Sequence, residues 1–176
     1  AKPVRPDLPG IHKSHVLTAA DVIEGHSTAG STVIVAGGGL VGCETALFLA
    51  EKGANVTCLE MLDGLAADME VTSRAYLIKK MVEAKVEWLT GVTLTEITDS
   101  GVKYMDQGGI SGLLEGDTVV LALGMAPDTG LETALRGKIP ELYEVGDCQI
   151  DLVATDRPGG VYGAIHSGFR AANDLD

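Results

Sequence analysis

The chain has 176 residues, 45% of them hydrophobic and 22% charged, and 13 Lys and Arg stand against 25 Asp and Glu, a net charge of −12. This size and composition predict a globular protein with a real core, and no apolar run reaches the roughly 18 residues that suggest a membrane span. The negative charge argues against a nucleic-acid backbone or an anionic bilayer as partner, because both attract clustered positive charge.

The three cysteines, Cys43, Cys58 and Cys148, lie far apart and form no C-x-x-C pair. We therefore expect neither a disulfide framework nor a zinc or iron–sulfur site, and the expected setting is reducing and cytoplasmic. The N-terminus lacks the basic start and apolar core of a signal peptide. Because the chain starts without an initiator methionine, we expect a fragment of a longer protein.

The first part of the chain predicts a β–α–β unit. Three prolines within residues 2–10 predict an extended linker, and residues 19–25 predict a short helix. Residues 31–36 (STVIVA) are apolar without alternation, as expected of a parallel strand buried on both faces. A helix over 40–52 and a strand over 55–60 follow, with a right-handed crossover.

A second helix is predicted over 70–84, with Tyr76, Leu77, Met81 and Val82 facing inward. The later elements are mostly short strands. They are a third parallel strand at 86–89, an antiparallel β-meander that includes 93–97 and 101–105, a buried strand at 117–123, an apolar strand at 141–145 and a tail helix from about Gly163.

Residues 37–42, GGGLVG, satisfy the pattern G-x-G-x-x-G, which is weak alone because glycine is common. Its context strengthens it, because the pattern follows a strand and opens a helix. In a dinucleotide site Gly37 permits the tight turn, Gly39 lets the backbone approach the pyrophosphate, and Gly42 lets the helix pack close to the strand. The anion would lie on the free N–H groups at the start of the helix, near Leu40 and Val41.

An acidic residue, Glu60, ends the second strand about 20 residues after the glycines. Its carboxylate would accept hydrogen bonds from the ribose hydroxyls and repel a 2′-phosphate, which favours NAD(H) over NADP(H). Two alternatives remain open: a glycine-rich turn with a solvated glutamate, and a methyltransferase-type site that shares the glycine turn and the acid.

Three stretches carry a family resemblance: GGGLVGCETALFLAEKGANVTCLEML, DTVVLALGMAPD and ELYEVGDC. They resemble the pyridine-nucleotide-dependent flavoprotein reductases over nearly the whole chain. Within these, the chain looks most like the C-terminal region of the NADH:flavin oxidoreductases related to 2,4-dienoyl-CoA reductase and 2-enoate reductase. The resemblance implies an NAD(H)-binding domain inserted into an FAD-binding domain. It also implies FMN and a 4Fe–4S cluster in an N-terminal region that this chain lacks.

The expected fold is therefore α/β, a Rossmann-like three-layer parallel sheet with a β-meander crossover, plus remnants of an FAD-binding domain. We expect a linker and FAD-domain remnant at 1–25, the NAD(H)-binding domain at 26–129 and the C-terminal part of the FAD-binding domain at 130–176. The expected cofactor-binding residues are Gly37, Gly38, Gly39, Leu40, Val41, Gly42, Glu44, Glu60, Met61, Ala122, Leu123, Gly124, Gly146 and Asp147.

Two of these residues have a second interpretation. Glu44, expected on the first turn of the glycine-motif helix, is either a carboxylate at the positive helix end or, by resemblance, a residue near the nicotinamide. Asp147 is either a turn aspartate or, by resemblance, the aspartate of the second FAD signature, which binds the ribityl chain. We expect no catalytic side chain and no metal ligand in this chain.

The resemblance implies a module that binds NADH and passes hydride to FAD. In the parent enzyme, electrons would then reduce the C=C bond of an enoate or enoyl-CoA. We expect the isolated chain to be inactive alone, and its partners to be NADH, FAD and the remainder of its own parent chain. A module of an NADH oxidase or disulfide reductase and a non-enzymatic NAD-sensing domain are the alternatives.

Overall fold

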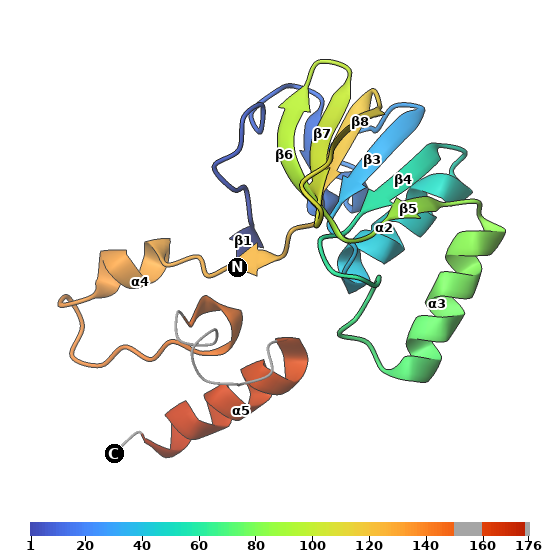
Figure 1. Ribbon diagram of the computed structural model, residues 1–176. Helices are drawn as coiled ribbons and strands as arrows, with labels where there is room; N and C mark the ends of the chain where they lie inside the picture. Colours follow the sequence, from blue (N-terminus) through green and yellow to red (C-terminus); the bar gives the residue numbers. More distant parts are fainter. Residues whose placement is uncertain (150–159, 175–176) are drawn as a thin grey trace. The chain divides into compact units, whose positions relative to one another are not determined.

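Five parallel strands form the central sheet of the segment Pro3–Gly124, in the order β2-β9-β3-β4-β5. Three of them, β3, β4 and β5, are labelled side by side in Figure 1. The computed structural model describes residues 1–149 and 160–174. The strands are β2 (Val16–Thr18), β3 (Thr32–Ala36), β4 (Asn55–Leu59), β5 (Glu87–Leu89) and β9 (Thr118–Leu121). The predicted parallel sheet is confirmed.

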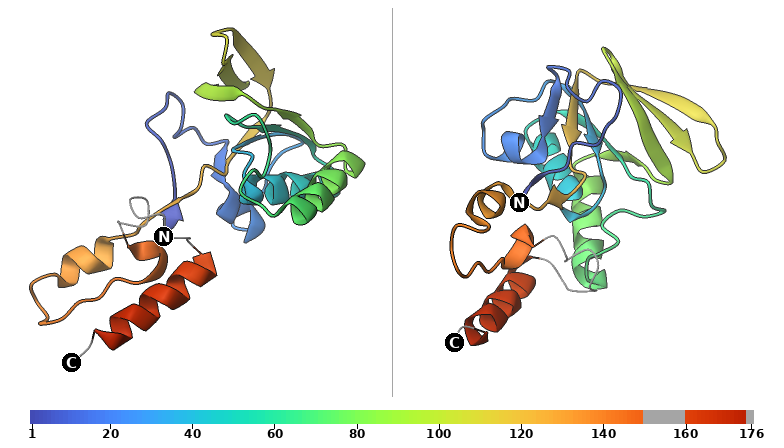
Figure 2. Two further views of the ribbon diagram at one scale, coloured as in Figure 1. Left: turned by 60° about the horizontal axis from the view of Figure 1, so that its bottom comes forward. Right: turned by 90° about the vertical axis from the view of Figure 1, so that its left-hand side faces the viewer.

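The sheet separates two layers that differ in structure. The left view of Figure 2 shows the antiparallel meander above the sheet and helices below it. The meander comprises β6 (Val92–Thr98), β7 (Gly101–Asp106) and β8 (Ser111–Glu115), and the helices are α1 (Ala19–Ile23), α2 (Leu40–Glu51) and α3 (Val71–Glu83). The three-layer arrangement predicted from the sequence is therefore confirmed.

Alternation along β3 explains why both faces are covered. Val33 and Val35 belong to the apolar cluster with the helices, whereas Ile34 and Ala36 belong to the cluster with the meander. All four residues are at most 1% exposed. A strand buried on both faces needs an unbroken apolar sequence, which is what residues 33–36 supply.

The helices of this unit start in different ways. Thr18 and Asp21 form a capping box at α1, and the bond from the Thr18 hydroxyl holds the pKa of Asp21 below its usual value. Glu70 caps α3 by accepting two backbone amides. By contrast, Gly39 precedes α2 and provides no side-chain hydrogen bond. The first N–H groups of α2 are therefore left for another acceptor.

One predicted face of α3 is wrong. Leu77 and Met81 are buried, but Tyr76 is 63% exposed and Val82 is 58% exposed. Residues four apart share one side of a helix, whereas positions 76 and 82 lie about 100° to either side of that stripe. Ile78 packs against the core instead.

The structure contains elements that the sequence analysis missed. β2 is a parallel edge strand beside β9, and β8 completes the meander. The missed signal for β2 is its position: VLT runs directly into the capping box of α1. The proline-rich segment before it lies on the meander, where the Ile97 amide donates to the Pro9 carbonyl at 2.8 Å.

The second compact unit comprises residues 1–2 and 125–176. Two short strands pair with each other, β1 (Lys2–Pro3) and β10 (Met125–Ala126). The remaining elements are α4 (Gly130–Leu135), the 3-10 turn η1 (Gly146–Cys148) and α5 (Gly160–Asn173). The predicted strand at 141–145 is wrong, because no sheet of the described residues includes this segment as a pairing partner. The tail helix begins earlier than its predicted start near Gly163.

Within the described residues, 1–149 and 160–174, no helix has the length and apolar character needed to cross a membrane.

Candidate dinucleotide-binding site

The carboxyl ends of three adjacent strands, β3, β4 and β9, meet at one edge of the sheet. The Gly37 amide, just after β3, donates to the Leu59 carbonyl of β4 at 2.9 Å, and the Ala122 amide donates to the Ala36 carbonyl at 2.8 Å. The glycine turn, the acid after β4 and the segment after β9 are therefore held together. In open α/β sheets, ligands bind at such carboxyl edges.

Any residue larger than glycine at position 37 or 42 would clash with the backbone. Gly37 has a φ of +106°, and a Cβ there would lie 2.4 Å from the Ala122 carbonyl oxygen. A Cβ on Gly42 would lie 1.8 Å from the Gly37 carbonyl oxygen. These contacts let α2 pack directly against the turn that precedes it.

Gly39 differs from its two neighbours in the motif. A Cβ on Gly39 would meet no atom within 4 Å, and its φ of −69° is open to any residue. Packing within the chain therefore does not explain a glycine here. The position lies beside the uncapped start of α2, so the open space and the free N–H donors fit the pyrophosphate of a dinucleotide.

Glu60 is only 8% exposed, and the backbone holds both of its carboxylate oxygens. Oε2 accepts the Gly38 amide at 2.6 Å, and Oε1 accepts the Leu62 amide at 2.8 Å. A carboxylate has about four acceptor positions, so these two bonds orient the group and leave capacity for ribose hydroxyls.

Apolar side chains are exposed on the loops around this edge. Val41 is 54%, Met61 64%, Leu62 53% and Leu123 36% exposed. Exposed apolar groups that gather in one place are typical of a binding surface. Their positions after β4, after β9 and at the start of α2 suit contact with the flat faces of a nucleotide.

Two buried thiols lie under the glycine turn, a contact that the sequence analysis did not predict. Cys43 Sγ donates to the Gly38 carbonyl at 3.3 Å, and Cys58 Sγ donates to the Gly37 carbonyl at 3.7 Å. The neighbouring Cys43 thiol, together with burial, raises the pKa of Cys58 well above its usual value. Cys58 is therefore a neutral packing group.

Glu44 lies elsewhere than expected along α2. The helix begins at Leu40 and carries no acidic residue in its first turn, so Glu44 belongs to the second turn. Its side chain is exposed, while Cys43 and Thr45 beside it are buried. The interaction with the helix dipole falls off within the first turn, which weakens the interpretation of Glu44 as a carboxylate at the helix end.

Gly146 and Asp147 lie in the second compact unit. Gly146 has a φ of +65°, and its amide donates to Ser167 Oγ at 2.8 Å. Ser167 in turn donates to the Gly163 carbonyl within α5 at 2.8 Å. Asp147 Oδ1 accepts the Gly160 amide at 3.1 Å, at the first residue of α5. Hydrogen bonds thus attach both Gly146 and Asp147 to α5. The sequence analysis did not predict the role of Ser167.

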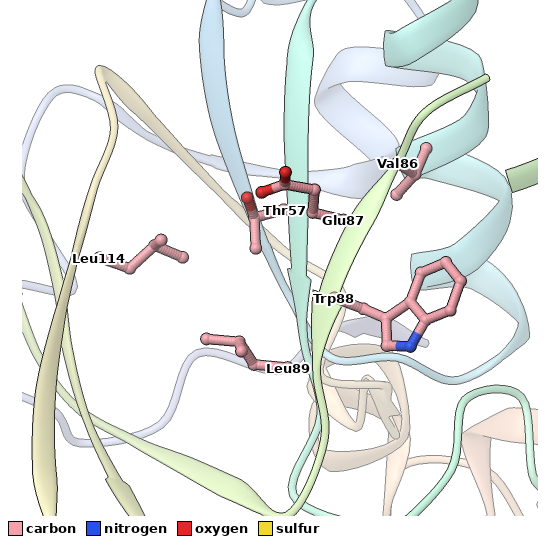
Figure 3. Close-up of a pocket in the computed structure, with 6 residues that line it drawn as sticks. All are labelled: Thr57, Val86, Glu87, Trp88, Leu89 and Leu114. Atoms are coloured by element: carbon pink, nitrogen blue, oxygen red, sulfur yellow. The ribbon is translucent and has the colours of Figure 1, made fainter. Parts of the chain in front are cut away.

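A groove of about 380 Å³ lies between β5 and the meander (Figure 3). It is lined by Thr57, Val86, Glu87, Trp88, Leu89 and Leu114. The side chains of Leu89 and Leu114 lie on one side of β5, and Trp88 points to the other side (Figure 3). None of the predicted site residues lines this groove.

Among residues 1–149 and 160–174, no group of three or more His, Cys, Asp or Glu side chains could hold a metal ion.

Comparison with known proteins shows similarity along nearly the whole chain. The family model described as pyridine nucleotide-disulphide oxidoreductase matches residues 1–168. An NADH oxidase of Thermoanaerobacter brockii is 36% identical over 177 residues, and a bilirubin reductase of Mediterraneibacter gnavus is 35% identical over 173 residues. Each alignment covers 98% of this chain and 26% of the relative. The chain therefore spans about a quarter of the length of these relatives.

A solved structure of a 2-naphthoyl-CoA reductase in complex with 2-naphthoyl-CoA has the same fold. The TM-score is 0.84 at 33% sequence identity, and the match covers 99% of this chain and 26% of the reductase chain.

Proposed function

Because the chain belongs to the pyridine nucleotide-disulphide oxidoreductase family, we propose that it binds NADH and presents it to an FAD in a longer flavoprotein. The observation that carries this proposal is the open position at Gly39, next to the uncapped N-terminus of α2 and the buried carboxylate of Glu60. When bound, the nicotinamide supplies a hydride and the flavin N5 accepts it. The residues of this chain bind the dinucleotide and orient it.

The backbone would hold the phosphates. The chain carries a net charge of −12, so it offers little general attraction for an anion. The N–H groups of residues 39–42 and the positive end of the α2 dipole provide a local site instead. We therefore expect the pyrophosphate on the glycine turn and the adenosine ribose beside Glu60.

The acid at position 60 supports NADH as the preferred nucleotide. Its two backbone hydrogen bonds, from Gly38 and Leu62, hold a negative charge where the 2′-phosphate of NADPH would lie. Repulsion between the two charges, in a largely buried place, disfavours NADPH.

The second compact unit suits an FAD-domain remnant. By resemblance, Gly146 and Asp147 match the second FAD signature, and α5 follows them in the chain. Along α5, Val161, Ile165 and Phe169 repeat every four residues and are 78%, 65% and 68% exposed. Such an apolar stripe suits contact with the remainder of the parent chain.

The names of two similar proteins indicate the type of reaction. They are a bilirubin reductase and a 2-naphthoyl-CoA reductase. These names support a parent enzyme that is a reductase. From the family resemblance we infer that it passes electrons from FAD through an iron–sulfur cluster to FMN and reduces an activated C=C bond of an enoate or enoyl thioester.

A flavin-reduction experiment tests this proposal. The full-length protein is mixed anaerobically with NADH or with NADH carrying deuterium in the transferred position, and the flavin absorbance is followed. Direct hydride transfer predicts bleaching that is slower with deuterium. Tight NADH binding without bleaching would instead indicate an NAD-sensing domain.

A second candidate function is supported by the 36% identity to the NADH oxidase of Thermoanaerobacter brockii. In that case NADH-reduced flavin would pass its electrons to oxygen. Oxygen consumption by the full-length protein with NADH, compared with reoxidation of its flavin by enoyl-CoA, separates the two functions. A disulfide reductase would instead reoxidise its flavin with a disulfide substrate.

A further inference from the structure

The loop after β4, residues 61–65, is tied on several sides. Its first residues are held by the backbone: the Gly91 amide donates to the Leu62 carbonyl at 2.9 Å. Its far end is held by Arg74, whose Nε donates to the Leu65 carbonyl at 2.7 Å. Between these two attachments, Asp63 Oδ1 accepts a hydrogen bond from Gln107 Nε2 at 2.7 Å.

Gln107 belongs to the turn between β7 and β8, far from this loop in the sequence. The turn is closed by Asp106, whose backbone amide and carboxylate Oδ1 bond to Ile110 at 2.9 Å and 2.8 Å. A Cβ on Gly91 would lie 3.4 Å from Gln107 Nε2 and 3.7 Å from Asp63 Oδ1. The side chains of Asp63 and Gln107 therefore lie directly against the backbone of Gly91. The closed turn holds the side-chain amide of Gln107 in this position.

The loop contains one of the two backbone amides that orient the candidate ribose acid, Glu60. The Leu62 amide donates to Glu60 Oε1 at 2.8 Å, so movement of residues 61–63 moves a hydrogen-bond donor of Glu60. Met61 and Leu62 are 64% and 53% exposed beside the same acid. Whatever fixes this loop also fixes the surface on which the adenosine half of the dinucleotide would lie.

We propose that Gln107 is a positioning residue for the adenosine half of the dinucleotide: its amide holds Asp63 and thereby keeps the Leu62 amide on Glu60. The inference rests on the proposed function. The meander lies on the opposite face of the sheet from the helices. The inference nevertheless gives it a role in cofactor binding.

Amide exchange tests the positioning step without any nucleotide. In the 176-residue chain, Gln107→Ala is expected to speed hydrogen exchange of the Leu62 amide roughly fivefold, the factor for one modest hydrogen bond. Gln107→Glu is expected to speed it further, because a carboxylate then faces the carboxylate of Asp63. Unchanged exchange in both variants would overturn the proposal, whatever the chain binds.

Ligand titration tests the consequence for binding. Gln107→Ala is expected to weaken NADH and AMP by about the same factor, on the order of three- to tenfold, and to leave nicotinamide mononucleotide unaffected. Equal affinities of the variant and the wild type for AMP would contradict the inference. Failure of the wild type to bind NADH would instead contradict the proposed function, and the exchange measurement would still decide the role of Gln107.

Two further variants separate positioning from general damage. The double variant Asp63→Asn with Gln107→Glu exchanges donor and acceptor, so it is expected to restore AMP affinity to within about twofold of the wild type. Lys103→Ala removes a different exposed meander bond, from Lys103 Nζ to Glu96 Oε2 at 2.8 Å. This control is expected to change neither Leu62 exchange nor AMP affinity, and an equal effect in the control would refute a specific role for Gln107.

Discussion

Glu60 Oε2 accepts the amide of Gly38 at 2.6 Å, which joins the acid at the end of β4 to the centre of the glycine turn. The sequence motif places these two residues in separate parts of the site, one for the ribose and one for the pyrophosphate. The structure links them through one hydrogen bond. A change at either residue is therefore expected to affect both halves of the proposed nucleotide site.

Glu60→Arg tests the ribose assignment. The substitution removes the proposed acceptor of the ribose hydroxyls and provides a cation for a 2′-phosphate, so we expect NADH to bind at least about tenfold more weakly and NADPH more tightly. Calorimetric titration with both nucleotides measures the change. Glu51→Arg, an exposed change of the same charge at the end of α2, is the control. A nucleotide preference that stays as in the wild type would exclude the ribose role of Glu60.

Gly42→Ala is expected to destabilise the fold. Its Cβ would lie 1.8 Å from the Gly37 carbonyl oxygen, so α2 must move away from the turn. Such overpacking against backbone costs at least about 2 kcal/mol of the free energy of unfolding. Urea denaturation measures this loss, and a variant as stable as the wild type would show that the close approach of α2 is not required.

Asp117 fastens the start of β3 to β9. Oδ2 accepts the amides of Ser31 and Thr32 at 2.9 Å and 3.0 Å, and the Thr118 hydroxyl donates to Oδ1 at 2.9 Å. Burial opposes ionisation of Asp117, but the bonds from Thr32, Thr118 and Ser31 outweigh it and hold its pKa below the usual 3.8.

A carboxyl with a lowered pKa stabilises the folded state above its unfolded pKa, and this stabilisation is lost as the pH falls through the folded pKa. Asp117→Asn is therefore expected to lower the free energy of unfolding at pH 7, by less than about 1 kcal/mol because the carboxylate is exposed and solvent screens its charge. The gap between the variant and the wild type should narrow as the pH falls below 3.8 and through the lowered pKa of Asp117, because the wild-type carboxyl then becomes neutral as well. Urea denaturation across this range measures it, and a gap that is independent of pH would contradict the account.

Ser167→Ala tests the attachment of Gly146 to α5. The variant leaves the buried amide of Gly146 without its acceptor at 2.8 Å, at an expected cost of about 1–3 kcal/mol in local stability. Hydrogen exchange of the Gly146 amide is expected to accelerate accordingly. Equal exchange in the variant and the wild type would show that Ser167 does not hold this turn.

Much of the central sheet could be predicted from the sequence, because residues 33–36 and 119–121 are apolar without alternation and both faces of these strands are covered. The glycine motif also located the turn between β3 and α2. The backbone lies so close to Gly37 and Gly42 that no side chain fits at either position.

The remaining features depend on contacts between distant segments. The exposure of Tyr76 follows from the narrow width of the buried stripe on α3, which periodicity alone does not set. The strand predicted at 141–145 failed because an apolar sequence forms a strand only beside a partner strand, and the described residues provide none there. The bond between Asp63 and Gln107 joins two exposed loops, and neither loop carries a local signal for it.

The most direct test of the account is a titration of the wild-type chain and Gly39→Ala with NADH. A Cβ at Gly39 would meet no atom of the chain within 4 Å. The free energy of unfolding of the variant is therefore expected to lie within about 1 kcal/mol of the wild-type value. If the open space holds the pyrophosphate, NADH affinity should fall at least about tenfold, because the Cβ would occupy the place of a phosphate oxygen. Equal NADH affinity in the two proteins, or no NADH binding by the folded wild type, would contradict a dinucleotide site at this turn.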